Sequence, residues 1–292
     1  RYTIRAEDQF GNKLATGMDA TKSVTFNITS SLGDEDILGS SLVNPSLGDY
    51  SPPSQKNLTG DLTGGEAYVD LMTTKAGTLT VSGTTTGIVG TNTEEPLVVL
   101  PLTTISSIRF KPGEEPNTPS STISQLLPFS VELIDAFGNL ITTNNSDIVE
   151  LNLIGAAQSF GNYSPQTASD GEVVFSGLRY TRADSFTIEA VLQSNPSLTD
   201  TAPMVVENGS VTRTIAILPD QTFTEGTGTL GTAITGVPFS GTGTVTAGDT
   251  FNVEVRAVDS SYNTVSTYTG SISLESTDPY LEVTPSTQNF AA

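Results

Sequence analysis

One pattern of apolar and polar positions occurs three times along the chain, as IRAEDQFGN at 4–12, VELIDAFGN at 131–139 and VRAVDSSYN at 255–263. In the middle copy, Phe129, Val131 and Leu133 alternate with Ser130 and Glu132. A period of two is typical of a β-strand that buries one face. The pattern therefore predicts a strand in which Phe129, Val131 and Leu133 are buried and Glu132 is exposed.

The acid that ends each strand begins a segment of turn-forming residues. Asp side chains accept hydrogen bonds from the backbone two residues on, and Gly and Asn tolerate the left-handed conformation of a tight reversal. The third copy has Tyr262 where the others have glycine, which predicts a different turn there. We expect the Asp, Gly and Asn residues that recur among the copies to form turns rather than to act in catalysis. They are Asp8, Gly11, Asn12, Asp135, Gly138, Asn139, Asp259 and Asn263.

The spacing of the phrase indicates a repeated domain. Asp135 lies 135 − 8 = 127 positions after Asp8, and Asp259 lies 259 − 135 = 124 positions after Asp135. This period is about the length of a β-sandwich domain. A second landmark agrees, because GEAYVDLMTTKAGTLTV at 65–81 matches GEVVFSGLRYTRADSFTI at 171–188. The first repeat carries a further Gly-, Pro-, Ser- and Asp-rich stretch at 33–57, which predicts a surface loop.

Strand and turn signals place the repeat boundaries near two short junctions. The prediction is an all-β chain of three β-sandwich domains, at 1–103, 104–209 and 210–292. The first begins without the opening strand that ISSIRF (105–110) supplies to the second. The third ends before any counterpart of the later strands. We therefore expect the missing strands to come from a longer chain or from a neighbouring subunit.

Charge and composition exclude several function classes. The net charge is −20, from 32 acidic and 12 basic residues, so a phosphate backbone is repelled and no nucleic-acid partner is expected. No apolar run reaches the roughly 20 residues of a membrane helix, so no membrane insertion is expected within this segment. The chain has no Cys, His or Trp, which removes Ser-His-Asp triads, thiol nucleophiles, disulfides and ordinary zinc sites.

Carboxylates are the remaining side chains that could serve in acid–base catalysis or bind a metal ion. Paired acids could serve glycoside hydrolysis, but these acids fall in turns or at exposed strand positions, so we expect no enzyme and no catalytic residue. The stretch GDEDILG gathers Asp34, Glu35 and Asp36, hard oxygen ligands that suit Ca²⁺. A solvated acidic loop accounts for them equally well. We therefore expect no cofactor, with these three residues as the calcium candidates.

The segment AGDTFNVEVRAVDSSYNTVSTYTGSISLESTD at 247–278 resembles the tandem immunoglobulin-like repeats of bacterial surface proteins, the broad invasin- and filamin-like group. The resemblance implies immunoglobulin-like sandwiches in an extended array, located outside the cell or on its surface. It also implies a structural role in a filament, layer or stalk, with self-association or neighbouring domains as partners. Two alternatives stay open: an adhesin module that binds a host or neighbour-cell ligand, and an accessory module of a larger surface enzyme.

Overall fold

The computed structural model describes residues 2–17, 22–30, 37–41, 57–85, 96–116, 126–275, 280, 282–284 and 287–290. Within these residues the chain consists of antiparallel β-sheets, and the one helix, α1 (Leu230–Ala233), is a single turn. The prediction of an all-β fold is confirmed. By compactness the chain forms two units, one of residues 1–107 and 133–145 and the other of residues 108–132 and 146–292.

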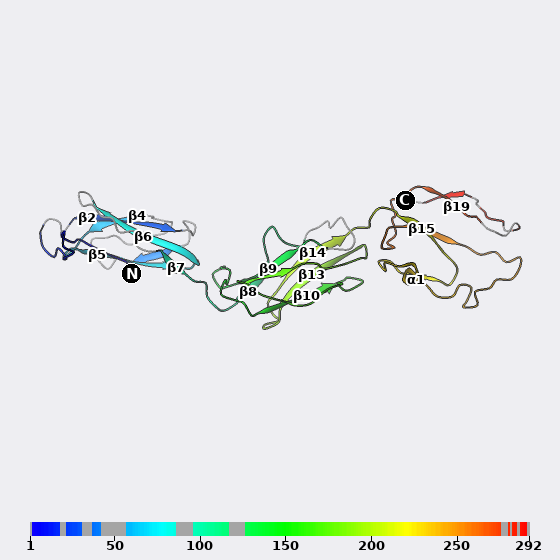
Figure 1. The fold of residues 1–292 in the computed structure, drawn as a ribbon, viewed down its shortest axis with the longest axis horizontal. Helices are drawn as coiled ribbons and strands as arrows, with labels where there is room; N and C mark the ends of the chain where they lie inside the picture. Colours follow the sequence, from blue (N-terminus) through cyan, green and yellow to red (C-terminus); the bar gives the residue numbers. More distant parts are fainter. Residues whose placement is uncertain are drawn as a thin grey trace. The chain divides into compact units, whose positions relative to one another are not determined.

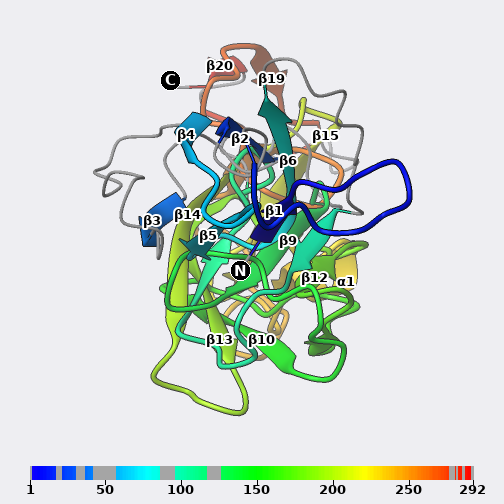
Figure 2. The same cartoon turned by 90° about the vertical axis from the view of Figure 1, so that its left-hand side faces the viewer.

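The first seven strands form two sheets, ordered β1-β5-β3 and β4-β2-β6-β7. Their bounds are Tyr2–Arg5 (β1), Ser23–Ser30 (β2), Ile37–Ser41 (β3), Asn57–Asp61 (β4), Glu66–Thr73 (β5), Gly77–Thr85 (β6) and Leu97–Val99 (β7). Figure 2 shows β1 beside β5, the pair in which Ile4 lies opposite Ala67. One core joins residues of both sheets, among them Phe26, Ala67 and Val81, so the two sheets form a sandwich.

Strand β3 corrects the prediction of a surface loop over 33–57. Residues 37–41 pair with β5, with a register irregularity between Ile37 and Gly39. The Gly and Ser residues of this stretch indicated a loop by composition, but a strand at the edge of a sheet tolerates them because it has only one neighbour to pair with.

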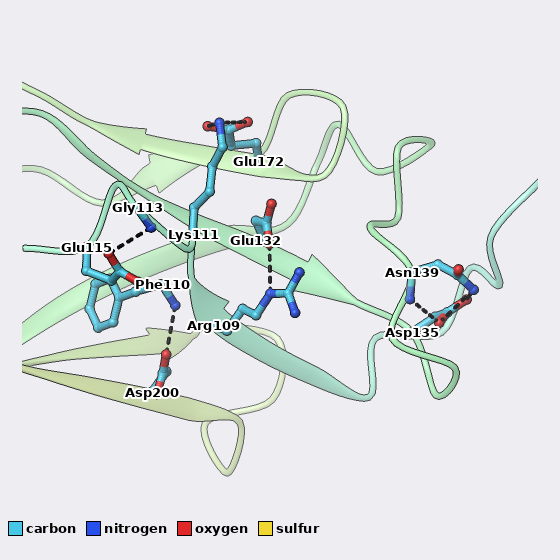
Figure 3. Close-up of polar contacts among 10 residues, drawn as sticks. All are labelled: Arg109, Phe110, Lys111, Gly113, Glu115, Glu132, Asp135, Asn139, Glu172 and Asp200. Carbon is cyan, nitrogen blue, oxygen red and sulfur yellow. Dashed lines mark hydrogen bonds and ion pairs between the residues drawn. The ribbon is translucent and has the colours of Figure 1, made fainter. Parts of the chain in front are cut away.

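The next seven strands form a four-stranded sheet, β11-β10-β13-β14, and a three-stranded sheet, β12-β9-β8. Figure 1 labels β8, β9, β10, β13 and β14 of these strands. Their bounds are Ser107–Phe110 (β8), Phe129–Ile134 (β9), Ile148–Ile154 (β10), Gln166–Thr167 (β11), Glu172–Phe175 (β12), Asp184–Leu192 (β13) and Thr199–Val206 (β14). The ring of Phe129 packs against Phe110 on one neighbouring strand and Phe175 on the other. The Asp200 carboxylate on β14 accepts a hydrogen bond from the Phe110 N–H on β8 at 2.7 Å, which ties the two sheets together (Figure 3).

Strand β9 is buried on both faces, which only partly agrees with the predicted alternation. Phe129, Val131 and Leu133 are buried as expected, but Ser130 and Glu132 are buried too. The prediction of an exposed Glu132 is wrong because Arg109 on β8 lies over it and donates from Nε to Glu132 Oε2 at 2.8 Å (Figure 3). The Ser130 hydroxyl is covered by Glu114, to which it donates at 3.0 Å.

The last strands form three two-stranded sheets, β15-β18, β16-β17 and β19-β20. Their bounds are Arg213–Ile217 (β15), Thr222–Phe223 (β16), Ile234–Thr235 (β17), Glu254–Val258 (β18), Ser271–Ser273 (β19) and Thr287–Asn289 (β20). A small core of Ile215, Ala233, Val258 and Tyr262 packs against Phe223 of β16 and Ile234 of β17. Strand β18 contains the start of the third copy of the repeated phrase, as β1 and β9 contain the start of the first two.

Substitutions in β9 test the corrected face assignment. Leu133→Ala removes a fully buried side chain and should lower the free energy of unfolding by about 2–5 kcal/mol. Glu132→Ala should lower it by about 1 kcal/mol, because the lost partner Arg109 is half exposed and is solvated afterwards. Urea unfolding of each variant measures both values. A silent Glu132→Ala would contradict the burial of this carboxylate.

Candidate functional site

The three copies of the repeated phrase form the same turn. In each, one carboxylate oxygen (Oδ1) of the aspartate accepts hydrogen bonds from the backbone N–H groups two and four residues later. The distances are 2.8 and 2.9 Å for both Asp8 and Asp135, and 2.8 and 3.0 Å for Asp259. The aspartate N–H donates to the asparagine carbonyl at 2.9 Å in the first two turns and 3.0 Å in the third. The carboxylate therefore closes a five-residue loop onto its own strand.

The third turn keeps this geometry although Tyr262 replaces glycine. The φ of Tyr262 is +64°, in the left-handed region that Gly11 (+80°) and Gly138 (+81°) also adopt. The prediction of a different turn is wrong, because tertiary contacts hold the tyrosine in this conformation. Arg213 Nη1 donates to the Tyr262 hydroxyl at 2.6 Å, and the Arg213 guanidinium carbon lies 4.8 Å from the ring centroid.

The asparagine that ends the second turn reaches a distant loop. Asn139 Nδ2 donates to the Thr74 carbonyl at 2.7 Å, and Asn139 Oδ1 accepts from the Ala76 N–H at 3.0 Å. Asn139 Nδ2 also lies 2.9 Å from Asp135 Oδ2, so the carboxylate fixes the orientation of the amide (Figure 3). The side-chain amide thus pairs with the loop between β5 and β6 as a backbone peptide group would. All of these residues belong to the first compact unit.

The third turn repeats the arrangement inside the second compact unit. Asn263 Nδ2 donates to the Thr181 carbonyl at 2.8 Å, and Asn263 Oδ1 accepts from the Ala183 N–H at 2.8 Å. The two loops reached are TKA at 74–76 and TRA at 181–183, which occupy equivalent places before β6 and β13. Each asparagine therefore holds the backbone on both sides of a basic residue. We name these two arrangements the joints: joint 1 contains Asn139 and joint 2 contains Asn263.

The second carboxylate oxygen (Oδ2) adds a third segment to each joint. Asp135 Oδ2 accepts from the Leu102 N–H at 3.0 Å, and Asp259 Oδ2 accepts from the Gly209 N–H at 2.9 Å. Leu102 lies just before β8, and Gly209 lies just before β15. One aspartate–asparagine pair therefore holds its own turn, the preceding connecting segment and a Thr-basic-Ala loop.

Joint 2 is further covered by the segment 225–229. A Cβ added at Gly226 would lie 2.6 Å from the Cβ of Arg182, so only glycine allows this close approach. The Thr181 hydroxyl donates to the Gly226 carbonyl, and Glu225 Oε1 accepts from the Thr264 N–H at 3.1 Å. These contacts account for the complete burial of Asp259 and Asn263.

Burial and hydrogen bonding have opposite effects on the pKa of the turn carboxylates. Burial raises the pKa of Asp135, but hydrogen bonds from the Asn139 side chain and from the N–H groups of Asn139, Leu102 and Phe137 outweigh it, and the net pKa lies below the ordinary value. The pKa of Asp8 is also lowered, first by the Asn12 side chain and then by the N–H groups of Asn12 and Phe10. Both turns thus favour the ionised acid.

In both joints the carboxylate and amide groups of the aspartate–asparagine pair bond to backbone groups and to each other. Within the described ranges no three acids come together in a way that could hold a metal ion. The calcium candidates Asp34, Glu35 and Asp36 lie outside the described residues, so that hypothesis stays a prediction. In the same described part of the chain, no helix has the length and apolar character needed to cross a membrane.

The Thr-basic-Ala loops were not identified as functional residues from the sequence. The matched landmarks at 65–81 and 171–188 contain both loops at equivalent positions. That alignment was the available signal, since a similar Thr-basic-Ala segment just before a strand in both landmarks indicates a shared role. Its partner was not visible because the joint uses only the backbone groups of the loop.

Comparison with known proteins finds a likeness among solved structures. No family model matches the chain, and no curated protein matches it. Among solved structures, the crystal structure of invasin, described as a bacterial integrin-binding protein, is similar at 14% identity and a TM-score of 0.31. The match covers 92% of this chain and 45% of that one, so this chain spans less than half the length of the invasin structure.

The lowered pKa of Asp135 predicts acid sensitivity. A carboxylate with a depressed folded-state pKa contributes stability above its unfolded pKa, near 4, and loses that contribution as the pH falls through the folded value. Asp135→Asn places an amide donor opposite the Leu102 N–H and should be less stable than the wild type at pH 7. This gap in the free energy of unfolding should narrow as the pH falls from 7 to below the unfolded pKa.

Chemical unfolding across this pH range measures the gap. Glu207→Gln, which changes an exposed acid outside the joints, is the matched control and should follow the wild type. A gap between Asp135→Asn and the wild type that stays constant with pH would show that ionisation of Asp135 contributes nothing to stability.

Proposed function

We propose that this chain is a non-enzymatic structural protein, a series of immunoglobulin-like β-sandwich repeats at 1–103, 104–209 and 210–292 that serves as a stiff spacer at the cell surface. The observation that carries the proposal is the joint. The same aspartate–asparagine turn holds a Thr-basic-Ala loop of the preceding repeat in two places, with the same atoms and nearly the same distances. A device repeated once per repeat is what a regular connection between repeats requires.

The energetics support stiffness at each junction. A neutral intramolecular hydrogen bond contributes about 0.5–1.5 kcal/mol net, and leaving a buried partner unsatisfied costs about 1–3 kcal/mol. In each joint the asparagine amide donates one hydrogen bond to the loop and accepts another from it. The aspartate accepts a third from an N–H of the preceding connecting segment. Since 1.4 kcal/mol changes an equilibrium tenfold, the closed state dominates. Flexible linkers between repeats would leave this geometry unformed.

The composition supports an exposed location. A net charge of −20 keeps such a chain soluble and limits random association, and the absence of cysteine removes exposed thiols. A stalk needs neither catalytic residues nor a cofactor. Among the roles that the sequence left open, the joints favour a spacer, because their aspartate and asparagine side chains bond to backbone of other segments of the same chain.

Trypsin gives a direct measure of each joint. The enzyme cleaves after Lys and Arg, and the N–H groups held by the asparagines belong to the bonds Lys75–Ala76 and Arg182–Ala183. Asn139→Ala should raise the initial cleavage rate at Lys75–Ala76 about tenfold, for a loss of about 1.4 kcal/mol in the free energy of opening. Asn263→Ala should do the same at Arg182–Ala183.

Each variant is a control for the other, because it should leave the other bond at its wild-type rate. Asn12→Ala changes the equivalent residue of the first turn and should alter neither rate. Fragment masses identify the bond that is cut. Equal rates at Lys75–Ala76 in the wild type and in Asn139→Ala would contradict the joint as a connection.

Distance measurements test the spacer role itself. The chain has no cysteine, so Thr3→Cys and Thr201→Cys introduce the only thiols for spin labels, both at exposed strand positions. Pulsed electron resonance should give a narrow distribution of label distances in this double variant and a clearly broader one after Asn139→Ala. Adding Asn12→Ala instead should leave the width unchanged. A broad distribution with Asn139 intact would refute a stiff spacer.

A further inference from the structure

The first turn has the geometry of a joint without the loop that completes one. Asp8 and Asn12 make the same internal bonds as their counterparts, including Asn12 Nδ2 to Asp8 Oδ2 at 3.0 Å. Within the described part of the chain, no hydrogen bond reaches Asn12 Oδ1, and no backbone N–H donates to Asp8 Oδ2. These are the two atoms that accept from the Ala76 and Leu102 N–H groups in joint 1.

The first turn is also more exposed to solvent than the other two. Asn139 is 9% exposed and Asn263 is fully buried, whereas Asn12 is exposed. The aromatic residue two positions after the aspartate follows the same trend: Phe137 in joint 1 is 49% exposed, but Phe10 is 78% exposed. The first turn thus presents an oriented amide and a bare aromatic ring to solvent. It has the internal order of the buried turns without their burial.

We propose that the Asp8–Asn12 turn is a docking site for the Thr-basic-Ala loop of a further repeat of this type. The inference rests on the proposed function, since it extends the joint to a third position. Asn12 would hold the loop carbonyl and N–H on either side of the basic residue, and Asp8 Oδ2 would accept the N–H of the connecting segment. The two such loops of this chain are already held by Asn139 and Asn263. The occupant is therefore a repeat whose loop is not engaged elsewhere.

A chain extended by one period tests this docking. Residues 1–127 are placed before Arg1 of the full chain. The added Lys75 then precedes Asn12 by 127 − 75 + 12 = 64 positions, the same spacing as from Lys75 to Asn139 in joint 1, 139 − 75 = 64. The connecting residue also keeps its spacing, since 127 − 102 + 8 = 33 equals 135 − 102. Lys75→Gln in the second period then leaves one Lys75–Ala76 bond for trypsin, the bond in the added period.

The added bond should be cut slowly in this chain and about tenfold faster after Asn12→Ala, the effect expected for two lost hydrogen bonds. A sister chain with Lys75→Gln in the added period reports the bond held by Asn139 and serves as the control. Fast cutting of the added bond whether or not Asn12 is present, with the control bond still protected by Asn139, overturns the docking site and leaves the proposed function intact. Loss of protection at the control bond overturns the proposed function.

A second extended chain covers the case in which the first does not fold. Residues 104–251 placed before Arg1 keep the spacing of joint 2, because 251 − 181 + 12 = 82 equals 263 − 181. The reporter is now Arg182–Ala183 of the added segment, with Arg182→Gln in the original copy. Dependence of its cleavage on Asn12 supports the docking site, and independence of Asn12 in this folded chain overturns it.

Discussion

The aspartate–asparagine pair of the repeated turn is the interaction on which both joints depend. The carboxylate accepts from its own turn with one oxygen and from the preceding connecting segment with the other, and it also holds the asparagine amide in position. That amide then behaves as one rigid peptide unit toward a loop distant in sequence. Because the acid is charged and nearly buried in joint 1, any loss of these donors would leave an uncompensated carboxylate. The turn and its contact with the Thr-basic-Ala loop are therefore stabilised by the same group.

Much of the fold followed from short-range pattern, because its causes are short-range. Alternation before each aspartate predicted β-strands, and the turn formers after it predicted a reversal, since both depend on residues a few positions apart. Leu133 is buried for the reason its position indicated. The second landmark contains both Thr-basic-Ala loops, but the sequence pattern assigned them neither a role nor a partner.

The failures come from contacts between distant residues. Glu132 reads as a solvent-facing position, but Arg109 on a neighbouring strand covers it. Tyr262 reads as a misfit in a glycine position, but Arg213 bonds its hydroxyl and lies over its ring. The partners of Asn139 and Asn263 could not be predicted at all, because every non-proline residue offers the same backbone N–H and C=O. A local sequence pattern has no means of recording which backbone the side chain will meet.

The two halves of a joint lie on different segments, and this fixes a polarity. The segment 104–209 carries the asparagine half at its second turn and the Thr-basic-Ala half at 181–183. A contact between unlike surfaces is heterologous, so it does not close into a two-fold dimer, and an open series of such contacts leaves one half of each kind free. In the proposed spacer, repeats joined in this way would add head to tail in one direction only. Such a spacer would therefore be directional at every length, with two chemically distinct ends.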